Sequence, residues 1–256
     1  MSTLIHPNYY LIDLKRMIRD GGNTMFIIGI PVLMYLIFGS TAESNDPALH
    51  ANVQFYVMQS MAVYGAVSAV VGISGSAVLE SIQGWSRQLG LTPLANAGYV
   101  ATKVAVALTY SLIVVIILFI IGAFTGARAD SIGIWISSAV LAWLLSTIFA
   151  LYGIAVGLSV KSQSGASIAT GFIIVLSFFG NLFVPLGGIM LQIARFTPMY
   201  GVAGLARWPQ LRGHQVGPEG MLTSDPLWSL VLNVVIWAAI FAVVAIFAVR
   251  KGRARR

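Results

Sequence analysis

The chain has no cysteine, few charged residues and only three histidines. The absence of cysteine excludes disulfides, cysteine nucleophiles and thiolate metal sites. Charged residues make up 9% of the 256 residues, whereas a soluble domain carries about a quarter. His6, His50 and His214 lie in separate polar segments, without the spacing of metal ligands. This composition leaves no room for a sizeable soluble domain and indicates an integral membrane protein.

Two further absences narrow the function. The chain has no Gly-x-x-x-x-Gly-Lys-Ser/Thr loop for nucleotide phosphates, so any ATP and Mg²⁺ that drive it must be held by a partner chain. No acidic or basic residue lies in the middle of an apolar stretch, which argues against proton relays, voltage sensing and sodium coupling through carboxylates. No set of catalytic acids, bases or metal ligands stands out. We therefore expect the chain to be no enzyme and to bind no cofactor or metal itself.

What the sequence does contain is six long apolar stretches. Residues 101–123 hold one charge, Lys103, near their start, and residues 227–249 hold none. A helix needs about 20 apolar residues to cross the hydrocarbon core of a bilayer. The stretches are continuous rather than alternating, which favours helices over the strands of a barrel. The predicted fold class is an all-α polytopic membrane protein with six transmembrane helices.

We expect residues 1–256 to form a single transmembrane domain. Leu11, Leu14 and Ile18 recur at helical spacing, which predicts a cytoplasmic helix in the membrane interface over residues 1–22. A long loop rich in glycine, proline and arginine is expected before the last span, at 195–226. The predicted spans are 23–39, 54–79, 99–123, 132–158, 166–194, which is broken, and 227–249, followed by a basic cytoplasmic tail at 250–256.

The first span has an alternative interpretation as a cleaved signal peptide, because it is short and small residues follow it at 40–42. The long polar leader and the five later spans favour its retention in the protein. With six spans, both termini lie on the same side of the membrane.

The distribution of the basic residues indicates which side of the membrane holds the termini. With both termini in the cytoplasm, eleven of the fifteen basic residues lie inside and four outside, in agreement with the positive-inside rule. Five of them occupy the last seven positions, next to an apolar run, where they favour anionic lipid. We therefore predict a multi-pass protein of the cell membrane that contacts the lipid bilayer and binds no nucleic acid.

The segment after the second span carries a motif. It reads Glu80-Ser-Ile-Gln-Gly84-Trp-Ser-Arg87-Gln-Leu-Gly-Leu-Thr92-Pro93. Glutamate, glycine four residues later and a closing Thr-Pro resemble a cytoplasmic segment of ABC type 2 transporter permeases, where it is a short helix in a groove of the ATPase subunit. The resemblance implies an ATPase-coupling segment formed by Glu80, Gly84, Arg87, Thr92 and Pro93. A generic interfacial loop between two spans is the alternative.

Other landmarks resemble the drug-export branch of the same family. They are the run Lys15-Arg16-Met17-Ile18-Arg19-Asp20 and a first span with a central Pro31 and a terminal Phe38-Gly39. The stretch 181–198, followed by Arg207, resembles the broken region of the family, in which the chain dips into the outer leaflet as two short helices.

The residues of this stretch also predict a break by themselves. Proline and paired glycines disrupt a straight helix, and irregular backbone at membrane depth survives only inside protein or beside a cavity. The resemblance implies a re-entrant outer gate formed by Asn181, Pro185, Gly187, Gly188 and Pro198. A simple kinked helix that ends near Gly188 is the alternative.

One group of side chains on the second span suggests a substrate path. Met58, Met61 and Tyr64 lie near one another on a helix, and methionine and aromatic side chains make adaptable binding surfaces. Packing against neighbouring helices or lipid is the alternative role for these residues.

Together these observations predict the membrane subunit of an ATP-driven exporter. Its cargo is expected to be hydrophobic or amphipathic: a drug, an antibiotic, a lipid-linked molecule or a peptide. The expected partners are separate ATP-binding subunits and a second permease, in a homodimer or a heterodimer. A secondary transporter or channel without an ATPase, and a polysaccharide-exporting permease, are the alternatives.

Overall fold

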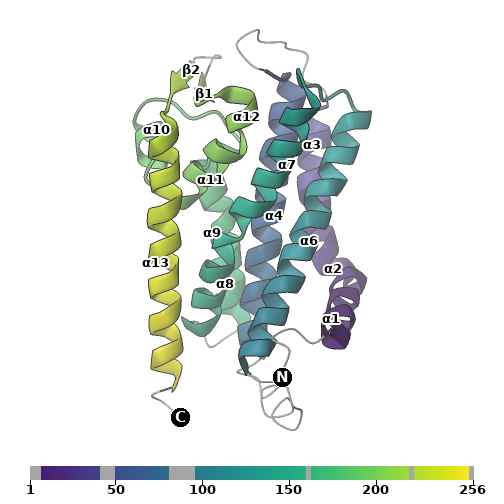
Figure 1. The fold of residues 1–256 in the computed structure, drawn as a ribbon, viewed down its shortest axis with the longest axis vertical. Coiled ribbons are helices and arrows are strands. Elements are labelled where there is room, and N and C mark those ends of the chain that lie inside the picture. The colour runs from purple at the N-terminus through teal and green to yellow at the C-terminus, as the bar shows by residue number, and fades with distance from the viewer. Residues whose placement is uncertain (1–6, 41–49, 81–95, 160–162, 219–221, 254–256) are drawn as a thin grey trace.

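The computed structural model describes residues 7–40, 50–80, 96–159, 163–218 and 222–253. Within these ranges the chain is mostly helical, and the long helices run side by side from one end of the molecule to the other (Figure 1). The predicted all-α polytopic membrane class is confirmed. An antiparallel hairpin of β1 (His214–Val216) and β2 (Leu222–Ser224) was not predicted from the apolar pattern. We call its end of the molecule the hairpin end.

The opposite end is called the α1 end, because α1 (Pro7–Arg19) lies there beside the bundle (Figure 1). Among the described residues, four helices are long and apolar enough to cross a membrane: Val53–Ser76, Gly98–Phe124, Ile132–Gly157 and Leu227–Ala248. Two shorter apolar helices cover Met25–Phe38 and Thr170–Phe179.

The centre of the bundle is α4 (Val53–Glu80). It packs against α6 (Asn96–Phe124), α7 (Ile132–Ser146) and α8 (Ile148–Ser159). In its most apolar stretch, 83% is buried inside the protein. The corresponding value for α13 (Leu227–Arg253) is 17%. A helix that is apolar all round and so weakly covered by the rest of the chain has the character of a membrane span.

Two small adjustments interrupt the predicted spans. The chain from α2 (Gly21–Thr24) continues through a π-helical turn, η1 (Met25–Gly29), into α3 (Ile30–Phe38). Pro31 stands in the first turn of α3, where its missing N–H is tolerated and the hydrogen-bond pattern shifts. In the fourth apolar stretch, α7 and α8 meet at Thr147, whose N–H donates to the carbonyl of Leu144, three residues earlier.

The expectation of a long loop over residues 195–226 is wrong. After α9 (Gln163–Phe179), the chain forms α10 (Gly188–Ala194), α11 (Pro198–Ala206) and α12 (Trp208–Leu211), and then the hairpin. Nearly every residue of α11 is buried, and α11 packs between α13, α7 and α9. Its glycines, alanines and valine make it narrow enough to be enclosed, whereas the glycines, prolines and arginines of residues 195–226 suggested a loop in the sequence.

Candidate functional site

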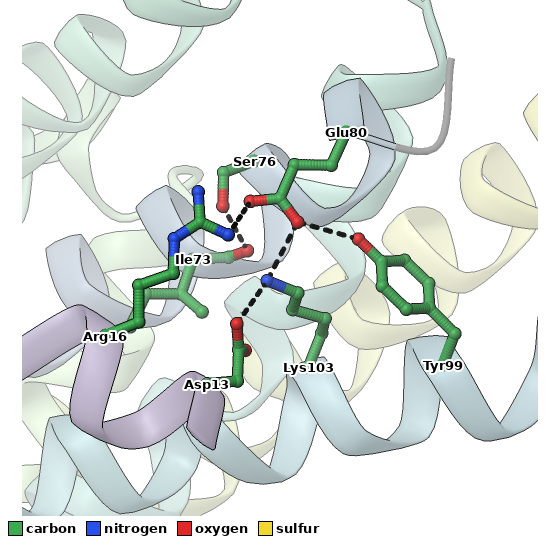
Figure 2. Close-up of polar contacts among 7 residues, drawn as sticks. All are labelled: Asp13, Arg16, Ile73, Ser76, Glu80, Tyr99 and Lys103. Carbon is green, nitrogen blue, oxygen red and sulfur yellow. Dashed lines mark hydrogen bonds and ion pairs between the residues drawn. The ribbon is translucent and has the colours of Figure 1, made fainter. Parts of the chain in front are cut away.

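A cluster of charged side chains lies at the α1 end, where α1, α4 and α6 meet (Figure 2). Asp13 and Met17, one turn apart, form the buried face of α1, while the basic residues of this helix are exposed. Glu80 is the last residue of α4. Tyr99 and Lys103 are one turn apart at the start of α6. Helical spacing thus brings the carboxylates of Asp13 and Glu80 and the ammonium group of Lys103 to one point.

Lys103 is at the centre of this α1-end cluster. Its Nζ lies 2.8 Å from Oδ1 of Asp13 and 2.9 Å from Oε2 of Glu80 (Figure 2). The hydroxyl of Tyr99 donates to the same Glu80 oxygen at 2.9 Å. Nη1 of Arg16 is 3.5 Å from the other Glu80 oxygen. The Lys103 and Asp13 side chains are only 1% and 3% exposed.

The cluster is balanced, with two carboxylates facing two cations. Charges taken out of water are tolerated when they are paired and hydrogen-bonded, and removing one partner of a buried pair costs about 3–5 kcal/mol. Arg16 is 60% exposed, so its contribution is small because water screens it. The pairs of Lys103 therefore hold the three helices together at this end.

Hydroxyl groups continue the same contact toward the middle of α6. The hydroxyls of Tyr10 and Thr109 are 2.7 Å apart, and those of Thr24 and Tyr110 are also 2.7 Å apart. The N-terminal helices are consequently fixed to α6 by side chains from three successive levels.

Of the predicted coupling residues, only Glu80 lies within the described residues. Gly84, Arg87, Thr92 and Pro93 lie outside them. Glu80 is not a free acid, since it pairs with Lys103 at the point where α4 leads into residues 81–95, and α6 begins at Asn96. The partners Asp13 and Lys103 were not predicted as site residues. Their charges at the edges of apolar patterns were the available signal, but their proximity depends on the fold.

The second place of interest is the break after α9. Asn181 has a positive φ of 56°, a conformation that asparagine adopts more readily than most residues. Its Nδ2 donates to the carbonyl of Val216 at 3.0 Å, and its Oδ1 accepts from the N–H of Leu186 at 2.7 Å. One side chain therefore satisfies backbone groups of both the break and the hairpin.

The carbonyl of Asn181 is held from the other side. It accepts from Nη2 of Arg207 at 2.8 Å and from the hydroxyl of Tyr56 at 3.3 Å. Arg207 is fully buried, and its Nη2 also donates to Oγ of Ser60 at 2.9 Å. From the sequence, Arg207 was identified only as a landmark beyond the break, and no role was predicted for it.

The remaining predicted gate residues shape the two short helices. Gly188, at φ +55°, starts α10, and Pro198 starts α11 in a buried position. A methyl group on Gly187 would lie 2.9 Å from the ring of Pro218. Pro185 lies in the irregular stretch between Asn181 and α10. The predicted residues thus all lie in or beside the break, and their gating role stays a prediction.

α13 supplies donors to the turn between α10 and α11. Nδ2 of Asn233 donates to the carbonyl of Arg195 at 2.8 Å, and Nε1 of Trp237 donates to the carbonyl of Phe196 at 2.9 Å. These carbonyls follow a helix C-terminus, where they have no partner within the helix. The turn between α10 and α11 is therefore held to α13 by two side-chain donors.

The predicted substrate-path residues lie inside the subunit. Met58 and Met61 are 0% and 2% exposed, and Met58 packs against Gly122 of α6. The ring of Tyr64 meets the ring of Phe183 edge to face, with centroids 5.0 Å apart. Their contacts within one subunit are packing contacts that connect α4 with the break, and a role in binding cargo stays a prediction.

Comparison with known proteins finds matches over most of the chain. The chain is 24% identical over 250 residues to YvfS of Bacillus subtilis (strain 168), a protein that bears the name of a transport permease; the match covers 95% of this chain and 96% of YvfS. The model of the family described as ABC-2 type transporter matches residues 12–208. This match includes Asp13, Glu80, Lys103, the break and Arg207. With most of its length matched, from α1 to the start of α12, the chain belongs to the ABC-2 type transporter family.

Proposed function

We propose that this chain is the membrane subunit of an ATP-driven exporter that is powered by separate ATPase subunits. The observation that carries the proposal is the α1-end cluster. It joins α1, α4 and α6 through buried ion pairs at the residue where α4 enters the predicted coupling segment. A displacement of that segment would therefore move three helices together instead of bending one.

The proposed mechanism is a rigid-body movement. Two ATPase subunits bind ATP and Mg²⁺, close on each other and push on residues 80–93 of each permease. Buried ion pairs and packed helices are bistable rather than continuously deformable, so the push becomes a hinge or shear movement of the bundle. The irregular backbone from Gly180 to Gly187 allows the hairpin end to rearrange. In this proposal the break is the outer gate.

The cargo and assembly follow from the spans and from the family. Uncharged spans suit a hydrophobic or amphipathic cargo such as a drug, an antibiotic, a lipid-linked molecule or a peptide. We assign the chain to the drug-export branch on its basic run and first span, and we place two permeases around one path. The α1 end faces the cytoplasm of a cell membrane, because the basic residues of α1 lie there.

The test is co-purification with the partner ATPase, followed by measurement of ATP hydrolysis and its stimulation by candidate cargo. Glu80→Gln keeps the side chain's size but removes the charge that pairs with Lys103. We expect this variant to retain the ATPase and to lose most of the cargo-stimulated hydrolysis. Asp130→Asn, at an exposed carboxylate that pairs with His50, is the matched control and should behave as wild type.

Stimulated hydrolysis that is unchanged in Glu80→Gln would rule out the coupling role. Failure of the wild-type chain to bind any ATPase, together with transport in its absence, would instead favour a secondary transporter or channel.

A further inference from the structure

Arg207 is a buried cation without a counter-charge among the described residues. Its side chain is 0% exposed, and a guanidinium stays protonated in proteins. Its contacts are with neutral groups: Oγ of Ser60, the carbonyl of Asn181, and the ring of Tyr56, whose centre lies 4.5 Å from the guanidinium carbon. The five ion pairs within the described part of the chain all involve other residues.

Several polar atoms near Arg207 also lack a hydrogen-bond partner within the described part of the chain. They include Nε and Nη1 of Arg207 and Nε2 of Gln210, one turn further on, all of which are buried. Gln59 reaches the same place, because its Nε2 donates to the carbonyl of Ala206 at 2.9 Å and to that of Ser138 at 2.9 Å. Oε1 of Gln59 and Oγ of Ser138 are likewise buried and unpartnered.

We call Gln59, Ser138, Arg207 and Gln210 the Arg207 cluster. These residues come from α4, α7, α12 and the junction between α11 and α12. Their unpartnered groups are three nitrogen donors of Arg207 and Gln210, the hydroxyl of Ser138, and one acceptor, Oε1 of Gln59. Buried donors without acceptors are costly, and more so when the donor is charged. Buried polar groups in natural proteins nearly always have a hydrogen-bond partner, so a bound species that accepts hydrogen bonds is expected in this cluster.

The charge decides what kind of occupant fits. A water molecule accepts hydrogen bonds but leaves the positive charge of Arg207 uncompensated, whereas an anion does both. The members of the cluster are buried, so the occupant must be small enough to be enclosed. We propose that the Arg207 cluster binds one small inorganic anion, with chloride as the physiological candidate.

Such an anion would act on the break. Arg207 donates to the carbonyl of Asn181, the residue that links the break to the hairpin. Neutralising the guanidinium in place keeps it buried and keeps that donor aimed at Asn181. The bound anion would therefore stabilise the arrangement of α11, α12 and the break that the structure shows. This inference is independent of ATP coupling.

The experiment uses the purified full-length chain in a neutral detergent. Its thermal unfolding midpoint is measured in sodium chloride and in sodium gluconate at equal ionic strength, because gluconate is too large to be enclosed. We expect chloride to raise the midpoint in a saturable way, by about 3 °C or more. Equilibrium dialysis with ³⁶Cl⁻ should show one chloride bound per chain.

Two variants locate the site. Arg207→Gln should lose both the chloride-dependent shift and the bound ³⁶Cl⁻. Arg128→Gln removes an exposed arginine at the same end of the molecule and should keep both. Equal midpoints of the wild type in the two salts with no bound ³⁶Cl⁻, or undiminished chloride binding in Arg207→Gln, would overturn the proposal. Should Arg207→Gln not fold, the wild-type dialysis decides alone.

Discussion

Lys103 is enclosed between two carboxylates, so its removal leaves unpaired charges as well as space. Replacing it with methionine keeps the length of the side chain. It leaves the buried carboxylate of Asp13 and one carboxylate oxygen of Glu80 without the ammonium group that pairs with them. We expect Lys103→Met to lower the free energy of unfolding by about 3–5 kcal/mol. Chemical unfolding in detergent measures this, with the exposed Lys15→Met as control. A loss below about 1 kcal/mol would show that the pairs do not hold the helices together.

Asn181 combines an unusual backbone conformation with two side-chain hydrogen bonds. Asn181→Gly removes the hydrogen bonds but tolerates the positive φ, whereas Asn181→Ala loses both advantages. We expect both variants to be destabilised, and the alanine variant by about 1 kcal/mol more than the glycine variant. Thermal unfolding of the two variants side by side provides the comparison. Equal stability would mean that the left-handed backbone is not retained when the side chain is lost.

Some of these residues were predicted from the sequence, but the contacts between them were not. Asn181 was predicted because a polar residue near proline and paired glycines stands out in an apolar run. Asp13 and Lys103 were visible only as charges at the edges of apolar patterns, and Arg207 as one arginine of an expected loop. Ion pairs between residues 13, 80 and 103 depend on helix packing, for which no local pattern exists.

At the scale of elements, the contact of α8 with α4 depends on Gly153. A methyl group added there would lie 2.9 Å from the backbone carbonyl of Val71 and 3.0 Å from Cβ of Ser74. Because backbone cannot yield as a long side chain does, we expect Gly153→Ala to destabilise the protein by about 1–3 kcal/mol. Gly171→Ala is the control, since its methyl would meet nothing within 4 Å. Thermal unfolding compares the two, and an equal effect would contradict the close approach.

The elements were predictable to different degrees for physical reasons. Apolar runs of span length predict helices because only a helix satisfies its own backbone in lipid. The stretch 195–226 was misjudged because its content of glycine, proline and arginine is typical of a loop. Pro198 and Pro209 instead stand in the first turns of α11 and α12, where a missing N–H costs nothing. The strands of the hairpin have three residues each, too few for an alternating pattern.

At the scale of the whole molecule, the proposed orientation can be tested with single cysteines, because the natural chain has none. Arg128 is exposed at the hairpin end and Lys15 is exposed on α1. In intact cells, a membrane-impermeant maleimide should label Arg128→Cys at once and Lys15→Cys only after permeabilisation. The reverse pattern would place the α1 end outside and contradict the positive-inside assignment.

We propose that nucleotide hydrolysis by a partner moves this chain through the α1-end cluster. The most direct measurement is uptake of cargo into inside-out proteoliposomes that contain the permease and its ATPase, with and without ATP. We expect uptake that requires both the ATPase and ATP and that falls at least tenfold in Glu80→Gln, about 1.4 kcal/mol of lost coupling. Concentrative uptake by the permease alone, without ATPase or nucleotide, would contradict it.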